Sequence, residues 1–70
     1  MAEIKSEMSG TITKVLVKVG DSVEEDQDVI GMESMKMEMF IASEDEGNVE
    51  TIHVAEGDFV NEGDLLITLK

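Results

Sequence analysis

Apolar and polar residues alternate along two neighbouring stretches near the middle of the chain, and the alternation changes phase between them. Before residue 34 the apolar side chains Ile30 and Met32 stand at even positions. After it they stand at odd positions, at Met35, Met37, Met39 and Ile41. A period of two residues is typical of a β-strand, and a change of phase means that the chain has turned or that its paired face has flipped. The pattern predicts a hairpin with its tip near Met35 and Lys36, which would hold the lysine in water.

The same stretch also permits a helix. Met, Glu, Lys and Ala favour helices, and three methionines fall at helical spacing, at Met32, Met35 and Met39. No Gly, Asn or Pro marks a hairpin tip between residues 32 and 42. We prefer the strands because both flanks alternate and because an internal repeat, described below, places strands there.

The remaining chain reads as short strands separated by polar turns. Residues 1–9 read as a short polar segment with few large apolar groups. A run rich in β-branched residues over 11–19 predicts a strand, which Gly20 and Asp21 end as a turn. Val23 stands alone before an acidic patch at 24–28, and a further strand is predicted over 29–32.

The second half of the chain repeats the first at a spacing of 37 residues, without gaps. Because neither half could bury an apolar face alone, we expect the halves to pack on each other as two small sheets. We predict one domain over residues 1–70, with the repeat at 10–33 and 47–70. The identical pairs include Gly10 and Gly47, Val17 and Val54, Gly20 and Gly57, Asp21 and Asp58, Val23 and Val60, Glu25 and Glu62, and Ile30 and Ile67.

The repeat also predicts where the candidate lysine lies. The equivalent of Lys36 would be position 73, just past Lys70. If a pseudo-twofold axis relates the halves, the termini therefore lie at one end of the molecule and Lys36 at the other.

Composition narrows the function classes. A chain of 70 residues without cysteine has neither a disulfide nor a thiolate metal site, and its 41% apolar content allows a compact core of Val, Ile, Leu and Met. The net charge of −12 argues against binding to nucleic acid or to an anionic membrane and favours partners with basic patches. No apolar run is long enough to span a bilayer, and the N-terminus lacks the pattern of a signal peptide. We expect a cytoplasmic protein that is monomeric in isolation.

Two other candidate sites are weaker. His53 lies between Ile52 and Val54, so we expect it to point outward from a strand, and no second histidine completes a zinc site. The acid clusters at 24–28 and 44–46 lack the spacing, central glycine and closing glutamate of an EF-hand. We interpret them as solvated turns and predict no metal site.

The motif Glu33-Ser34-Met35-Lys36-Met37 resembles the biotin-attachment motif of biotinyl domains, which most often reads Glu-Ala-Met-Lys-Met. The resemblance covers nearly the whole chain, because it includes the repeat, the two Gly-Asp turns and the central lysine. The chain is similar to the small stand-alone biotin/lipoyl attachment proteins of bacteria, within the biotinyl/lipoyl domain family.

The resemblance implies an all-β fold, a flattened β-barrel (barrel-sandwich hybrid) of two four-stranded antiparallel sheets with pseudo-twofold symmetry. It implies no protruding thumb, because the segment between Gly20 and Val29 has no room for that insertion. Two residues depart from the common pattern. Ser34 replaces alanine, and Asp26 stands where many relatives have glycine, as Gly63 does in the second half. If that turn requires positive φ, aspartate tolerates it less well than glycine.

The resemblance further implies a carrier that is not itself an enzyme. Biotin protein ligase would attach biotin covalently to Lys36, with Glu33, Met35 and Met37 as recognition residues, and biotin carboxylase and carboxyltransferase subunits would then use the loaded chain. A lysine amine is protonated at neutral pH, so the ligase must supply an activated acyl group and help to remove the proton. Met35 and Met37 could instead be strand residues packed on the barrel edge, and Lys36 an ordinary surface lysine.

Two alternatives stay open. The first is a lipoyl carrier on the same fold, serving an oxoacid dehydrogenase or a glycine cleavage system with lipoate as the cofactor. Lipoyl domains usually read Asp-Lys-Ala at the tip, so Met35 and Met37 favour biotin. The second is an unmodified β-barrel adaptor in which Lys36 carries nothing.

Overall fold

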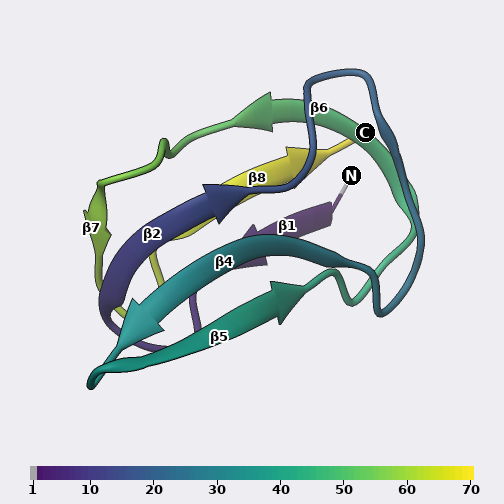
Figure 1. Cartoon of the computed structure of the whole chain (residues 1–70). Coiled ribbons are helices and arrows are strands. Elements are labelled where there is room, and N and C mark those ends of the chain that lie inside the picture. Colours follow the sequence, from purple (N-terminus) through teal and green to yellow (C-terminus); the bar gives the residue numbers. More distant parts are fainter. Residues whose placement is uncertain (1) are drawn as a thin grey trace.

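The computed structural model describes residues 2–70, and they form eight β-strands (Figure 1). The prediction of an all-β fold is confirmed, and the helical alternative over 32–42 is wrong. No helix among the described residues is long and apolar enough to cross a membrane. In chain order the strands are β1 (Ala2–Lys5), β2 (Gly10–Val15), β3 (Ser22–Val23), β4 (Asp28–Ser34), β5 (Met37–Ala42), β6 (Gly47–Ile52), β7 (Phe59–Val60) and β8 (Leu65–Leu69).

The strands build two four-stranded antiparallel sheets, as predicted, in the orders β1-β8-β6-β3 and β5-β4-β2-β7. We call the second one the hairpin sheet and the first one the terminal sheet. A shift of 37 residues carries β2, β3 and β4 onto β6, β7 and β8. The halves exchange their two-residue strands, because β3 joins the terminal sheet and β7 joins the hairpin sheet. This exchange ties the halves into one body.

Hydrogen bonds in the turns follow the same shift. The Asp21 carboxylate accepts from the Lys18 N–H at 2.8 Å, and the equivalent Asp58 carboxylate accepts from the Ala55 N–H at 2.9 Å. Each aspartate thereby closes a short turn in the way that aspartate side chains commonly do. The two Gly-Asp turns of the sequence are therefore equivalent in structure.

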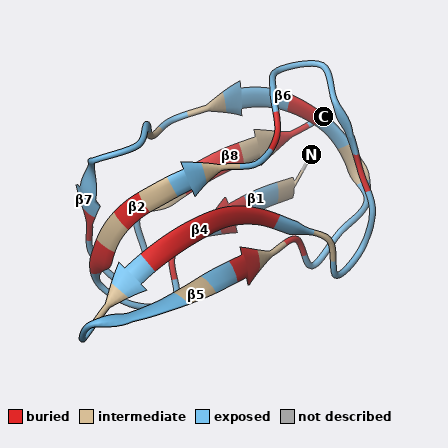
Figure 2. Ribbon diagram, viewed as in Figure 1, coloured by how far each residue is buried: buried red, intermediate tan, exposed pale blue. Residues whose placement is uncertain are grey.

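The core lies between the sheets and is aliphatic. Figure 2 shows the buried residues running along the middle of β4, and further buried residues lie on the other strands and on the loop after β2. Both phenylalanines stay outside it. The buried apolar side chains are Ile4, Ile12, Val17, Val23, Val29, Ile30, Met32, Ile41, Val49, Val60, Leu66, Ile67 and Leu69.

Two predicted segments need correction. Residues 1–9, read from the sequence only as a short polar segment, contain a strand that was not predicted, because residues 2–5 form β1 and pair with β8; Met1 lies outside the described residues. The strand predicted over 11–19 ends at Val15. Val17 is buried, but the chain is already turning there, because the Lys18 N–H donates to Asp21 rather than to a neighbouring strand.

The termini and the β4–β5 turn lie at opposite ends of the molecule (Figure 1). Ala2 is the register partner of Leu69, which brings the two chain ends together. The molecule extends 31 Å along its long axis and 19 × 18 Å across it. The arrangement expected from the repeat, with Lys36 facing away from the termini, is thus present.

Candidate functional site

The predicted hairpin tip is a two-residue turn between β4 and β5. Ser34 and Met37 are the last paired residues, so Met35 and Lys36 alone form the loop. Both have positive φ, 54° for Met35 and 65° for Lys36. Two consecutive residues with positive φ define the type I′ turn, whose twist matches that of the flanking strands. The prediction of a hairpin with its tip at Met35 and Lys36 is confirmed.

The turn is strained because neither loop residue is glycine, asparagine or aspartate. The left-handed conformation costs an ordinary residue about 1–2 kcal/mol. Such a conformation persists where the surrounding structure over-determines it. Here β4 and β5 are in register down to the turn, and Met32, the partner of Met39, is completely buried. The strands therefore hold the lysine in a backbone conformation that it would not adopt alone.

The side chains at the tip project into solvent. Met35 is 90% exposed and Met37 is 63% exposed, whereas Met32 on the same hairpin is fully buried. Lys36 is exposed as well. Exposed fractions this high are unusual for methionine, which normally fills cores. Exposed, flexible thioether side chains are typical of surfaces that bind a partner. Met35 lies in the turn, and Met37, the first residue of β5, is mostly exposed, so the interpretation that both pack on the barrel edge is wrong.

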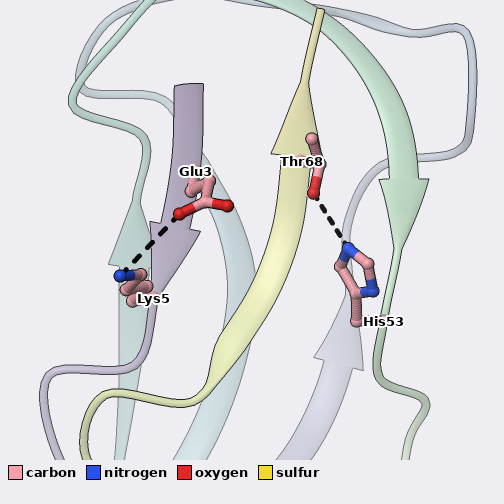
Figure 3. Close-up of polar contacts among 4 residues, drawn as sticks. All are labelled: Glu3, Lys5, His53 and Thr68. Atoms are coloured by element: carbon pink, nitrogen blue, oxygen red, sulfur yellow. Dashed lines mark hydrogen bonds and ion pairs between the residues drawn. The ribbon is translucent and has the colours of Figure 1, made fainter. Parts of the chain in front are cut away.

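The Lys36 amine makes no ion pair with any of the residues that the structure describes. Across residues 2–70 a single ion pair is present, in which Lys5 Nζ lies 3.7 Å from Glu3 Oε1 on β1 (Figure 3). Glu33 and Glu38 flank the tip as register partners, and both are exposed. Like charges directly opposite each other are unfavourable in a sheet. Within residues 2–70, no ion pair therefore holds the amine against the protein surface.

Two side-chain hydrogen bonds tie the hairpin to the segment around β2. Ser34 Oγ donates to the Ser9 carbonyl oxygen at 2.7 Å, from the last residue of β4. Thr13 Oγ1 donates to Glu38 Oε2 at 3.1 Å, near the start of β5. Sequence reasoning missed both bonds. Serine in place of the common alanine was the available signal for the first, and nothing in the pattern indicates the second.

The turn at Asp26 does have positive φ, the condition under which aspartate is less well tolerated than glycine. Asp26 has φ of 69°, and the equivalent Gly63 has φ of 90°. The Asp26 N–H donates to the Ser43 carbonyl oxygen at 2.7 Å, and the Gly63 N–H donates to the equivalent Ser6 at 2.8 Å. The turn geometry is thus the same in both halves, although only one of them uses glycine.

The other candidates lie away from the tip. His53 is exposed, and its Nε2 lies 2.9 Å from Thr68 Oγ1 on the terminal sheet (Figure 3), so its predicted outward orientation is confirmed. Within residues 2–70, no group of three or more histidine, aspartate or glutamate side chains is arranged to hold a metal ion. The hairpin tip is therefore the candidate site.

The sequence matches a known family and two closely similar proteins. The family model described as "Biotin-requiring enzyme" matches residues 1–69. The biotin/lipoyl attachment protein of Bacillus subtilis is 47% identical over 66 residues, which are 94% of this chain and 90% of that protein. The biotin carboxyl carrier protein of Streptococcus mutans is 53% identical over 62 residues, which are 89% of this chain but 48% of that protein.

A solved structure shares the fold. The urea carboxylase of Kluyveromyces lactis contains a region that superimposes on 99% of this chain with a TM-score of 0.92 and 36% sequence identity. The matched region is 6% of that enzyme. The two sheets described above thus occur elsewhere as one part of a much larger protein.

Proposed function

Because this chain belongs to the biotin/lipoyl attachment family, we propose that it is a biotin carrier that biotin protein ligase modifies on Lys36. One observation carries the proposal: Lys36 occupies a strained two-residue turn, exposed, at the end of the molecule away from the termini. We also propose that residues 1–70 are one domain with the repeat at 10–33 and 47–70, supported by the equivalent turns of the two halves.

The role of Lys36 is to present a primary amine at a fixed place. The proposed bond is an amide between this amine and the carboxyl group of biotin. The ammonium group of Lys36 first transfers one proton to a base. The neutral amine then attacks the carbonyl carbon of the acyl group that the ligase has activated, and the activating group departs. A long flexible stem lets the amine enter the active site of another protein. The rigid hairpin limits the search to the motion of that stem.

The residues at the tip fit a covalently attached cofactor. Covalent attachment needs an exposed amine that is not engaged elsewhere, and Lys36 meets this requirement among the described residues. When attached, biotin supplies a carrier for a carboxyl group that a carboxylase and a carboxyltransferase exchange. The chain itself contributes position and reach, because tethering raises the effective concentration of the cofactor at each client site.

Met35, Met37 and Glu33 are the proposed recognition residues. The two methionines offer apolar contacts on either side of the amine, and their exposures of 90% and 63% leave both thioethers accessible to a ligase. Glu33 is exposed two residues before the turn and adds a charge for a basic group of the partner.

A lipoyl carrier is the second candidate, because the Bacillus relative is named for both attachments. The methionines at the tip and the 53% identity to a biotin carboxyl carrier protein favour biotin. The two carriers differ in the mass that they add to Lys36, and an unmodified adaptor would add none.

Intact mass spectrometry distinguishes the three functions. We expect the chain, expressed in cells that contain both a biotin and a lipoyl ligase, to gain one biotin-sized increment. The Lys36→Arg variant should lose the increment, whereas Lys18→Arg, a matched change of another exposed lysine, should keep it. A lipoyl-sized increment on Lys36 would replace the first candidate by the second, and no increment would leave the adaptor.

The role of the methionines has its own test. We expect Met35→Asp combined with Met37→Ala to reduce the rate of biotinylation by at least tenfold without lowering the melting temperature, since both side chains are exposed and pack little. Rates are compared with purified ligase, and circular dichroism checks the fold. Unchanged labelling would remove both residues from the recognition role.

A further inference from the structure

Both aromatic residues of the chain are exposed on the outer face of the hairpin sheet. Phe40 is 49% exposed and Phe59 is 65% exposed, and the sequence contains no tyrosine or tryptophan. Each directly precedes a buried residue on its strand, Ile41 on β5 and Val60 on β7, so the ring points away from the core. The two phenylalanines therefore contribute nothing to the buried core.

The pseudo-twofold repeat provides an internal comparison for these positions. A shift of 37 residues carries Phe59 onto Ser22 and Phe40 onto Glu3. Both equivalents are exposed on edge strands of the terminal sheet, whose outer face is polar and carries Glu3 and Thr68 (Figure 3). The same fold thus accepts serine and glutamate where the hairpin sheet has phenylalanine. Folding alone does not require an aromatic ring at either position.

The same contrast recurs beside Phe40. Exposed Met8 in the loop before β2 has Asp45 as its equivalent. A hollow of about 120 Å³ lies next to it. Its lining residues are Glu7, Met8, Met39, Phe40 and Ile41.

Register places both rings close to Lys36. Phe40 follows Lys36 by four residues, about 14 Å along an extended strand. Phe59 is paired with Thr11, which is paired with Glu33, so Phe59 lies two strand spacings, about 10 Å, from a residue near the tip. A standard interface covers about 800 Å² per partner, equivalent to a circle of roughly 16 Å radius. A footprint centred on Lys36 therefore reaches both rings.

We propose that the outer face of the hairpin sheet, with Phe40 and Phe59 as its apolar anchors, is the docking surface for biotin protein ligase. The inference rests on the proposed function. The ligase has to bring its active site to the amine of the bare lysine, so it must cover the protein surface around the tip. A carboxylase acts on the biotin at the end of the modified Lys36 side chain, so its active site lies farther from the protein surface, by the length of that side chain and its biotin. The surface next to the turn therefore fits the ligase better than a client carboxylase.

The charges on this face indicate which side chains the surface of the partner should carry. The exposed acids nearby are Glu33, on β4 between the strands that carry the two rings, and Glu38, two residues before Phe40 on β5; the chain as a whole carries −12. Lys14, a basic residue of this face, has its Nζ 6.0 Å from the centre of the Phe40 ring. The complementary surface of a ligase would present apolar pockets for the rings with basic side chains between them.

Exchanging residues between the halves tests the proposal. Phe59→Ser and Phe40→Glu each install the residue that the terminal sheet already carries, and Phe40→Thr removes the ring without adding charge. Val19→Glu is the matched control, because Val19 is 64% exposed, lies in the loop between β2 and β3 and has Glu56 as its equivalent. Initial rates of biotinylation are measured with purified ligase, ATP and biotin over a range of carrier concentrations.

We expect each phenylalanine variant to raise KM for the carrier at least fivefold, the double variant about twentyfold or more, with kcat unchanged and Val19→Glu like the wild type. A binding readout is added with Lys36→Arg chains, which cannot accept biotin but compete with the wild type for the ligase. Competition should weaken when the phenylalanine changes are combined with Lys36→Arg. Melting temperatures show that the variants remain folded.

The outcomes separate this inference from the proposed function. If the wild type is biotinylated and the double variant has wild-type KM and competes normally, the docking surface is refuted while the carrier function stands. If the wild type is never biotinylated, both fail. If the variants are labelled normally but, once loaded, are poor substrates for a carboxylase, the face belongs to the client enzyme and the ligase assignment is overturned.

Discussion

Replacing Gly10 by alanine tests how closely β2 packs against the hairpin. A Cβ atom at Gly10 would lie 2.6 Å from the Glu33 carbonyl oxygen and 2.9 Å from Met32 Cγ. The equivalent glycine of the other half, Gly47, is the matched control. There a Cβ atom would lie 3.2 Å from the Lys70 carbonyl oxygen. The two substitutions are chemically identical and differ only in what the new methyl group meets.

The structure sets the magnitude of the difference. Relief of the contact at Gly10 requires the Glu33 carbonyl group, in the middle of a four-stranded sheet, to move by more than half an ångström. Overpacking of this kind costs about 1–3 kcal/mol. Both alanines also restrict the unfolded chain, which contributes about 0.4–1 kcal/mol of stability and cancels between the variants. Gly10→Ala should therefore lose about 1–2 kcal/mol net, and Gly47→Ala should lie near the wild type because exposed Lys70 can shift.

Thermal unfolding followed by far-ultraviolet circular dichroism measures the effect. For a chain of 70 residues, the entropy of unfolding is about 0.15 kcal/mol per kelvin, so 1 kcal/mol shifts the melting temperature by roughly 7 °C. We expect Gly10→Ala to melt about 7–14 °C below the wild type. Because the Glu33 carbonyl group precedes the turn, biotinylation of Lys36 should also slow in this variant.

Equal melting temperatures for the two glycine variants would refute this reasoning. They would mean that the Glu33 carbonyl group moves freely, and hence that the hairpin is not held at a fixed height above β2. A loss at Gly47→Ala that exceeded the loss at Gly10→Ala would contradict the packing described here even more directly.

Two further substitutions test the turn and its anchor. Asp26→Gly should raise the melting temperature by about 3–7 °C, because relief of the left-handed conformation at φ 69° outweighs the added freedom of the unfolded chain, and Gly63→Asp should do the opposite; a lower melting temperature for Asp26→Gly would contradict the strain. Ser34→Ala should lower it by about 3–7 °C, because the bond to the Ser9 carbonyl oxygen contributes roughly 0.5–1 kcal/mol. In the Ser34→Ala variant the rate of amide hydrogen exchange at the tip should increase, and an unchanged rate would show that this bond does not anchor the hairpin.

The sequence was most informative where its pattern was local. Alternation on both sides of residue 34 placed the hairpin, and the lysine motif placed the candidate site on its tip. The register partner of Ser34 is Met37, so the phase change in the pattern corresponds to the turn itself. The residues that carry the proposed chemistry were thus available from sequence.

Elements defined by distant pairing were harder to predict. β1 contains one large apolar residue, Ile4, and becomes a strand only because β8, more than 60 residues later, offers it a partner. The sequence did contain a signal for this strand. If the 37-residue repeat is extended to positions before residue 10, Ile4 becomes the equivalent of Ile41 and Ser6 the equivalent of Ser43. β3 and β7, with two residues each, are too short for any period to appear.

Side-chain contacts between distant segments were beyond the pattern. Thr13 donates to Glu38 at the bulge where β2 and β4 shift register between Ile12 and Lys14, and the pattern of one strand does not show which side chain of a distant strand lies beside such a bulge. The exposed phenylalanines were visible in the sequence, but their meaning depends on knowing that Glu3 and Ser22 occupy equivalent places.

The adjacent chain ends give the molecule two different mechanical responses. A force that pulls the two ends apart acts on the corner where Ala2 pairs with Leu69, and it would peel β1 from β8 one hydrogen bond at a time. A force between Lys36 and either end acts along the strands, across ladder bonds that lie perpendicular to it and must break together. Lys36 is therefore placed on the axis along which this small barrel resists load best.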